Sequence, residues 1–187
     1  GPLACIAAGS SGALVLDVSD PAAPRQLAAI PSPDARDLAL EGDVLLVADA
    51  DAGLRSFDIS VPERPAETGP PLAPAVRVSM GKGWALAIGP AGVSIVGVTE
   101  SGGLRVEGFY RTEWAEDAFR DGGRLIVAEG HRGLTVLDVS DPGRPRIVSA
   151  LRDLYASAAS PLEGCVLVAG AGSVTAVRVL VPPWLER

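Results

Sequence analysis

Three aspartates of the sequence recur with a serine two positions later, and such pairs of oxygen-bearing side chains could do chemistry. They are Asp17, Asp58 and Asp138. A carboxylate beside a hydroxyl suits acid–base catalysis or a hard metal ion. Each of these aspartates, however, ends an apolar run and stands shortly before a proline. An aspartate in that place accepts backbone N–H groups and closes a turn. We therefore expect a structural role for all three and predict no catalytic residue among them.

A second pair of carboxylates, Asp49 and Asp51, lies in the turn Asp-Ala-Asp-Ala-Gly. Paired carboxylates on a turn suit Ca²⁺. The corresponding turns elsewhere begin at Gly9, Gly89 and Glu129, and none contains a second carboxylate. A repeated ligand set is therefore missing, and turn formation is the favoured interpretation. We predict neither a metal site nor a cofactor.

His131 is the only histidine in the chain. A zinc site built from several histidines is thus excluded, and a Ser–His–Asp triad is feasible only at this residue. No Gly-x-Ser-x-Gly turn, which would present a nucleophilic serine, accompanies it. We expect an exposed loop histidine and do not predict an enzyme.

An internal repeat of the sequence indicates the secondary-structure elements that position these residues. Apolar runs start after Gly12, Gly53, Gly92 and Gly133, with a period of about 40 residues, and a weaker fifth copy ends near residue 182. A second apolar run precedes each glycine, and two further runs flank this pair in most copies. Four short runs per period, bounded by turn residues and without helical periodicity, indicate four antiparallel strands.

Repeated four-stranded units predict an all-β fold, a small β-propeller of about five four-stranded blades. We expect one domain over residues 1–187, with repeats at about 3–34, 35–74, 75–114, 115–155 and 156–187. The terminal blades are incomplete in this scheme, with three strands each. The tail around Trp184 is expected to supply an irregular edge to the last blade.

The stretches 13–24 and 134–145 both contain Leu-Asp-Val-Ser-Asp-Pro, and they resemble the LVIVD repeat of bacterial and archaeal proteins. The resemblance covers essentially the whole chain. It implies propellers of secreted or surface-displayed proteins, and it transfers no catalytic residue. The third repeat departs from the pattern, with Gly97 in place of the aspartate.

Function is expected where the repeats differ. In a propeller, the loop between blades and the loop between the second and third strands lie on one face, which is usually the binding face. The most unusual loops of this kind are 112–117 and 129–132. The candidate binding residues are Glu113, Trp114, Glu116, His131, Arg132, Arg152, Asp153 and Tyr155. For Trp114 two interpretations remain open, an exposed recognition residue or an apolar filler between blades.

Charge, hydropathy and cysteine content bear on the partners and the cellular location of the chain. The net charge is −7 without a basic cluster, which argues against nucleic-acid binding. The uncharged run 83–99 contains Gly89-Pro90 and is read as strand–turn–strand, so no membrane span is predicted. Cys5 and Cys165 form a disulfide in one interpretation, which would join the terminal blades, and stay buried thiols in the other.

These observations predict a non-catalytic binding or scaffolding propeller, located extracellularly, in the periplasm or on the cell surface. Its partner would be a protein or a glycan. One alternative is a structural subunit of an oligomer or larger extracellular assembly, completed by a partner chain. Another is an enzyme or metal-dependent sugar-binding module that uses Asp51, Glu113 and Glu116.

Overall fold

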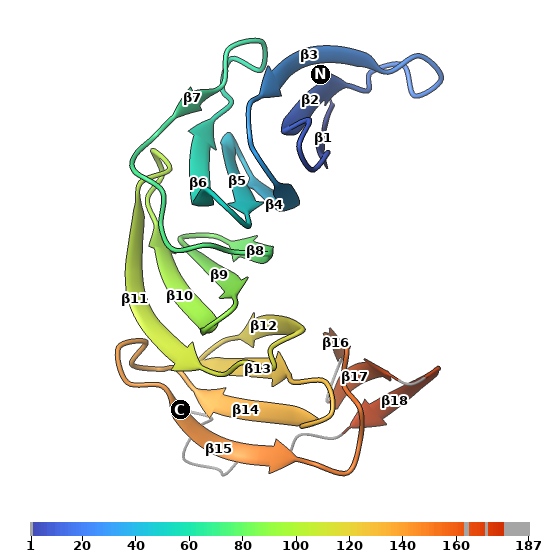
Figure 1. Cartoon of the computed structure of the whole chain (residues 1–187), viewed down its shortest axis with the longest axis vertical. Coiled ribbons are helices and arrows are strands. Elements are labelled where there is room, and N and C mark those ends of the chain that lie inside the picture. Colours follow the sequence, from blue (N-terminus) through green and yellow to red (C-terminus); the bar gives the residue numbers. More distant parts are fainter. Residues whose placement is uncertain (1, 163–164, 171, 178–187) are drawn as a thin grey trace. The chain divides into compact units, whose positions relative to one another are not determined.

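The computed structural model describes residues 2–162, 165–170 and 172–177, which form strands and turns only (Figure 1). The strands of this part of the chain make five antiparallel sheets of three or four strands. The weaker repeat end near residue 182 and the tail around Trp184 lie outside the described residues.

Each sheet is built from consecutive strands. The first contains β1 (Leu3–Ala7), β2 (Ala13–Asp17) and β3 (Arg25–Ile30). The second contains β4 (Ala35–Glu41), β5 (Val44–Asp49), β6 (Gly53–Asp58) and β7 (Ala66–Glu67). The third contains β8 (Arg77–Gly81), β9 (Trp84–Gly89), β10 (Gly92–Val98) and β11 (Leu104–Arg111). The fourth contains β12 (Asp117–Asp121), β13 (Arg124–Ala128), β14 (Leu134–Asp138) and β15 (Arg146–Leu151). The fifth contains β16 (Ala158–Leu162), β17 (Cys165–Gly170) and β18 (Ser173–Val177).

The chain divides into two compact units. The first comprises residues 1–90 and 96–106, and the second comprises residues 91–95 and 107–187. Each unit has its own buried apolar residues and is described separately below.

The core of the first unit explains why its central strands read as continuous apolar runs. All six residues of β5 are buried. Successive side chains of a strand point to opposite faces. Accordingly, Leu45 and Val47 pack with Val15 of β2, whereas Leu46 and Ala48 pack with Val78 of β8. A strand covered on both faces must be apolar on both faces, which is the pattern that the sequence shows.

The second unit repeats this arrangement. Ile126 and Ala128 of β13 and Val136 of β14 pack with Ala159 of β16 and Val168 of β17 in one buried cluster. The strands predicted from apolar runs are thus the strands that form the core.

The glycine that opens the third strand of a repeat is required for two reasons. At Gly133 the backbone φ is +79°, a conformation that residues with a side chain adopt at a cost. A Cβ at this position would also overlap the backbone carbonyl oxygen of Leu151. Gly53 has a φ of +93° and meets the Leu72 carbonyl oxygen in the same way. The recurring glycine therefore marks close contact between two backbone segments.

Two aspartates tie neighbouring sheets together. Asp37 of β4 accepts a hydrogen bond from the backbone N–H of Val78 on β8, at 3.0 Å. Asp117 of β12 accepts one from the N–H of Ala159 on β16, also at 3.0 Å. The two aspartates occupy the same position of alternate repeats, so the tie is a repeated feature of the fold.

The all-β prediction is confirmed, and so is the strand–turn–strand interpretation of residues 83–99, which form β9 and β10. A fourth strand was expected in the second repeat, but no apolar run located it; it is the two-residue strand β7, and both of its residues are exposed. The described part of the chain contains no helix with the length and apolar character of a membrane span.

Candidate functional site

The repeated aspartates close turns. The Oδ1 atoms of Asp17, Asp58 and Asp138 each accept the backbone N–H of the serine two residues on, at 2.8 to 2.9 Å. Hydrogen bonds from that serine lower the pKa of all three carboxyls. These are the contacts of an Asx turn, in which the carboxylate replaces a backbone acceptor.

Asp49 is fully buried, and its carboxylate is occupied by the chain's own donors. Oδ1 accepts the backbone N–H groups of Asp51 at 2.8 Å and Ala52 at 2.6 Å, and Oδ2 accepts the hydroxyl of Ser32. Burial raises the pKa of Asp49, but these hydrogen bonds outweigh burial and hold it below its usual value. Asp51 itself is exposed. Among the described residues, no group of three or more His, Cys, Asp or Glu side chains is placed to hold a metal ion.

In the second unit the residue matching Asp49 is Glu129, which is 2% exposed. Its carboxylate accepts hydrogen bonds from four side chains, which come from the loop 112–117, from β11 and β14, and from the residue that follows β15. Oε1 accepts the hydroxyls of Thr112 at 2.7 Å and Tyr110 at 3.2 Å, and Oε2 accepts the Thr135 hydroxyl and Arg152 Nη1, the latter at 3.2 Å.

This set of donors determines the charge of Glu129. Burial raises the pKa of the carboxyl, but the hydrogen bonds from Thr135, Thr112 and Arg152 outweigh burial and hold it below its usual value. The pKa of Tyr110 is raised by burial and by the neighbouring Glu129 charge. Glu129 is therefore a buried anion whose desolvation is offset by directed donors.

Trp114 and Arg132 lie at the surface above this network. The Trp114 side chain is 44% exposed, and its role in recognition stays a prediction. The Arg132 guanidinium carbon is 5.2 Å from the centroid of the Trp114 ring, which is within cation–π range. Arg152 Nη1 bonds the Arg132 backbone carbonyl at 2.8 Å, and therefore connects the Arg132 loop to Glu129.

Two aromatic rings, those of His131 and Tyr155, are in contact next to Arg132. His131 and Tyr155 meet edge to face, with ring centroids 4.7 Å apart. The Tyr155 hydroxyl donates to Glu116 Oε1 at 2.9 Å, which raises the pKa of Tyr155. Three separate segments of the chain are joined in this way.

Contacts thus link six of the residues predicted to form a binding patch into two groups of three, which meet at the chain neighbours His131 and Arg132. We call Trp114, Glu116, His131, Arg132, Arg152 and Tyr155 the Trp114 surface. Glu113 and Asp153 are also exposed. Sequence reasoning missed Glu129 and its partners Tyr110, Thr112 and Thr135. The available signal was an acidic residue directly after a run of apolar residues in two alternate repeats, at Asp49 and at Glu129.

The two cysteines are free thiols in this structure, each half-buried. Burial raises the pKa of Cys5. Cys5 and Cys165 belong to different units of the chain, and the disulfide that would join them stays a prediction.

Comparison with known proteins places this arrangement in a family. The LVIVD repeat matches residues 1–27, 33–70 and 121–152, together just over half of the chain. The chain belongs to the LVIVD repeat family. No curated protein sequence matches this LVIVD protein.

Solved structures similar to the LVIVD protein share its fold at low sequence identity. The computationally designed Ika8 protein is 11% identical, with a TM-score of 0.72 over 96% of this chain and 56% of its own. The designed Ika4 protein is 11% identical, with a TM-score of 0.58 over 78% of this chain and 91% of its own. A protein from Lactobacillus plantarum is 15% identical, with a TM-score of 0.63 over 93% of this chain and 64% of its own.

The LVIVD chain thus spans little more than half the length of Ika8 and under two thirds of the Lactobacillus protein. At these identities the likeness concerns the fold alone. Together with the repeat family and the five sheets, it confirms the predicted small β-propeller.

Proposed function

We propose that this LVIVD propeller is a non-catalytic binding module that docks a partner protein on the Trp114 surface. The observation that carries the proposal is the exposed Trp114 ring with the Arg132 guanidinium stacked on it. Tryptophan, tyrosine and arginine are the residue types that dominate binding energy at protein interfaces. All three occur on the Trp114 surface.

The network beneath the surface supports the proposal because it fixes the contact groups before a partner arrives. Arg152 is bonded to Glu129 and to the Arg132 carbonyl, and Tyr155 is bonded to Glu116. Side chains that are already ordered lose less conformational entropy on binding. A preorganised aromatic and cationic surface therefore suits recognition better than turnover, which needs a reacting group poised at a substrate.

We place the module outside the cytoplasm, extracellularly, in the periplasm or on the cell surface. This part of the proposal is supported by the resemblance to LVIVD repeats of secreted and surface-displayed proteins.

A display selection tests the proposed function. Peptides selected on the immobilised wild-type chain are re-tested on Trp114→Ala and on Ile147→Ala, a matched control because Ile147 is 57% exposed and lies outside the Trp114 surface. We expect selected peptides to lose at least about tenfold in affinity on Trp114→Ala, the loss typical of an interface hot spot. Ile147→Ala should bind them as the wild type does.

Other results would reassign the function. Selected peptides that bind Trp114→Ala as well as the wild type would contradict the proposal. Saturable binding to a glycan array that disappears in Trp114→Ala would keep the surface and replace the protein partner with a sugar. Turnover of a hydrolase or lyase substrate, lost on changing Glu116, would overturn the non-catalytic reading.

A further inference from the structure

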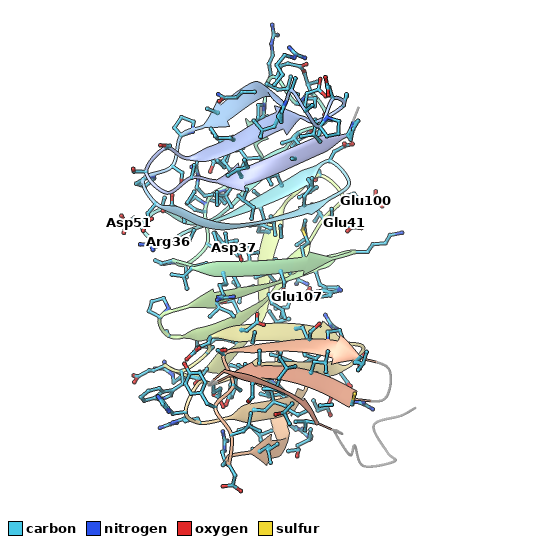
Figure 2. All side chains as sticks on the ribbon, turned by 90° about the vertical axis from the view of Figure 1, so that its right-hand side faces the viewer. Arg36, Asp37, Glu41, Asp51, Glu100 and Glu107 are labelled. Atoms are coloured by element: carbon cyan, nitrogen blue, oxygen red, sulfur yellow. The ribbon has the colours of Figure 1, made fainter. Side chains whose placement is uncertain are left out.

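A pocket of about 440 Å³ opens in the first unit, and none of the residues discussed as binding candidates lines it. It lies between the β4–β5 turn, the β8–β9 turn and the end of β10, at residues 41–44, 80–83 and 98–100. Figure 2 shows Glu41 and Glu100 at one end of the strands, opposite the end with Arg36 and Asp51. The volume of the pocket falls in the range typical of sites for small ligands.

The inner wall of this pocket is apolar. Val44, Met80 and Val98 line it, and the same three residues belong to, or pack against, the core cluster around Leu46. The wall is therefore the edge of the hydrophobic core. Water in contact with such a wall is displaced favourably by an alkyl chain.

The rim of the pocket is acidic. Glu41, Asp43 and Glu100 line it together with a single cation, Lys82. All four residues are exposed. Carboxylates that gather at the mouth of a low-dielectric cleft focus a negative potential there, and this potential attracts positively charged ligands.

We propose that this pocket binds an aliphatic ammonium group, with the alkyl chain on Val44, Met80 and Val98 and the charge between Glu41 and Glu100. Two sources supply that chemistry, a free alkylamine or diamine and the lysine side chain of a partner protein. The site is independent of the Trp114 surface, so either proposal stands if the other fails.

The composition of the chain provides a site-specific probe. Met80 is the only methionine and lines the pocket, so its ε-methyl group gives one assigned signal in a ¹H–¹³C spectrum of the full chain. We expect 1,5-diaminopentane and 1-aminopentane to shift this signal saturably. 1-Pentanol, which has the alkyl chain without the charge, should bind at least about threefold more weakly, as removal of surface ion pairs predicts.

Three variants decide the role of the charges. Glu41→Gln combined with Glu100→Gln should weaken amine binding at least about threefold. Glu63→Gln, an exposed glutamate in a turn outside the pocket, should leave it unchanged. Lys82→Gln should strengthen amine binding, because it removes the cation that competes for the same carboxylates.

A comparison of ligands distinguishes a partner's lysine side chain from a free amine as the natural occupant of the pocket. A shift of the Met80 signal by a capped Gly-Lys-Gly peptide would assign the site to a partner's lysine, and a shift by the diamine alone would assign it to a free amine. The proposal is overturned if neither amine shifts the Met80 signal. It is also overturned if 1-pentanol binds as well as 1-aminopentane, or if Lys82→Gln weakens amine binding.

Discussion

In the second unit, Arg152 Nη1 lies 3.2 Å from Glu129 Oε2 and 2.8 Å from the carbonyl oxygen of Arg132. One guanidinium nitrogen thus connects a buried carboxylate to the loop that carries the exposed cation of the Trp114 surface. Glu129 is 2% exposed, whereas the Arg152 side chain is 49% exposed. The buried Glu129 carboxylate therefore holds the Arg152 guanidinium in place, and Arg152 in turn holds the exposed loop that carries Arg132.

Removing the Glu129 charge should destabilise the chain. Glu129→Gln leaves four donors facing an uncharged amide, which we expect to cost about 1–3 kcal/mol of unfolding free energy at pH 7. Urea unfolding measures this cost. Glu63→Gln, at an exposed position, should stay within about 0.5 kcal/mol of the wild type. An equal effect of the two substitutions would contradict the assigned role of Glu129.

The same carboxyl should make stability depend on pH in a defined direction. The folded pKa of Glu129 is lower than its ordinary value of about 4.3. Its contribution is therefore complete above that value and is lost as the pH falls from about 5 through the folded pKa. Asp49, whose pKa is also lowered, adds to this loss. Unfolding at pH 7 and pH 4 should show a smaller acid-induced loss for Glu129→Gln than for the wild type. A larger loss would contradict the account.

The tie between sheets at Asp37 predicts a second effect on stability. Asp37→Ala leaves the N–H of Val78 without its acceptor, at a cost of about 1–2 kcal/mol. Asp37→Asn keeps an acceptor oxygen and should lose less. Asp51→Ala, at an exposed turn position, is the matched control and should be near neutral. The prediction fails if Asp37→Ala is as stable as Asp51→Ala in the same denaturation experiment.

The close backbone contact at Gly133 predicts a larger effect. Gly133→Ala combines a positive φ with overlap on the Leu151 carbonyl oxygen, and should cost about 2–5 kcal/mol. Gly122→Ala separates the two terms, because Gly122 has a φ of +56° and nothing within 4 Å of its Cβ position. It should cost about 1–2 kcal/mol. Thermal unfolding in which both variants lose the same stability would show that the contact is unimportant.

Much of the fold was predictable, since strands such as β5 and β13 are buried on both faces and therefore contain continuous apolar runs, residues 44–48 in β5 and 125–128 in β13. The role of the recurring glycine was also predictable. It stands between two apolar runs in each repeat, where the chain must turn tightly and a side chain would obstruct the turn. The position of β7 was not predictable, since its two residues are exposed and have no packing that would impose an apolar pattern.

The candidate site was predictable in outline only. The propeller resemblance placed loops 112–117 and 129–132 on one face, and the structure shows contacts between these loops at Trp114 and Arg132. Glu129 itself was missed, because a charged residue in a turn is normally taken as solvated. Its carboxylate is held by Tyr110, Thr112 and Arg152, which lie 17 to 23 residues from Glu129 in the sequence and meet it only in the folded chain.

The central claim is that the Trp114 ring contacts the partner, and ¹⁹F NMR of the chain labelled with 5-fluorotryptophan tests it most directly. The three tryptophans are Trp84, Trp114 and Trp184, and a Trp114→Phe variant assigns the signal in question. Addition of a peptide selected on the wild-type chain should shift the Trp114 signal and leave that of Trp84 in place. A peptide that binds saturably without moving the Trp114 signal would contradict the account.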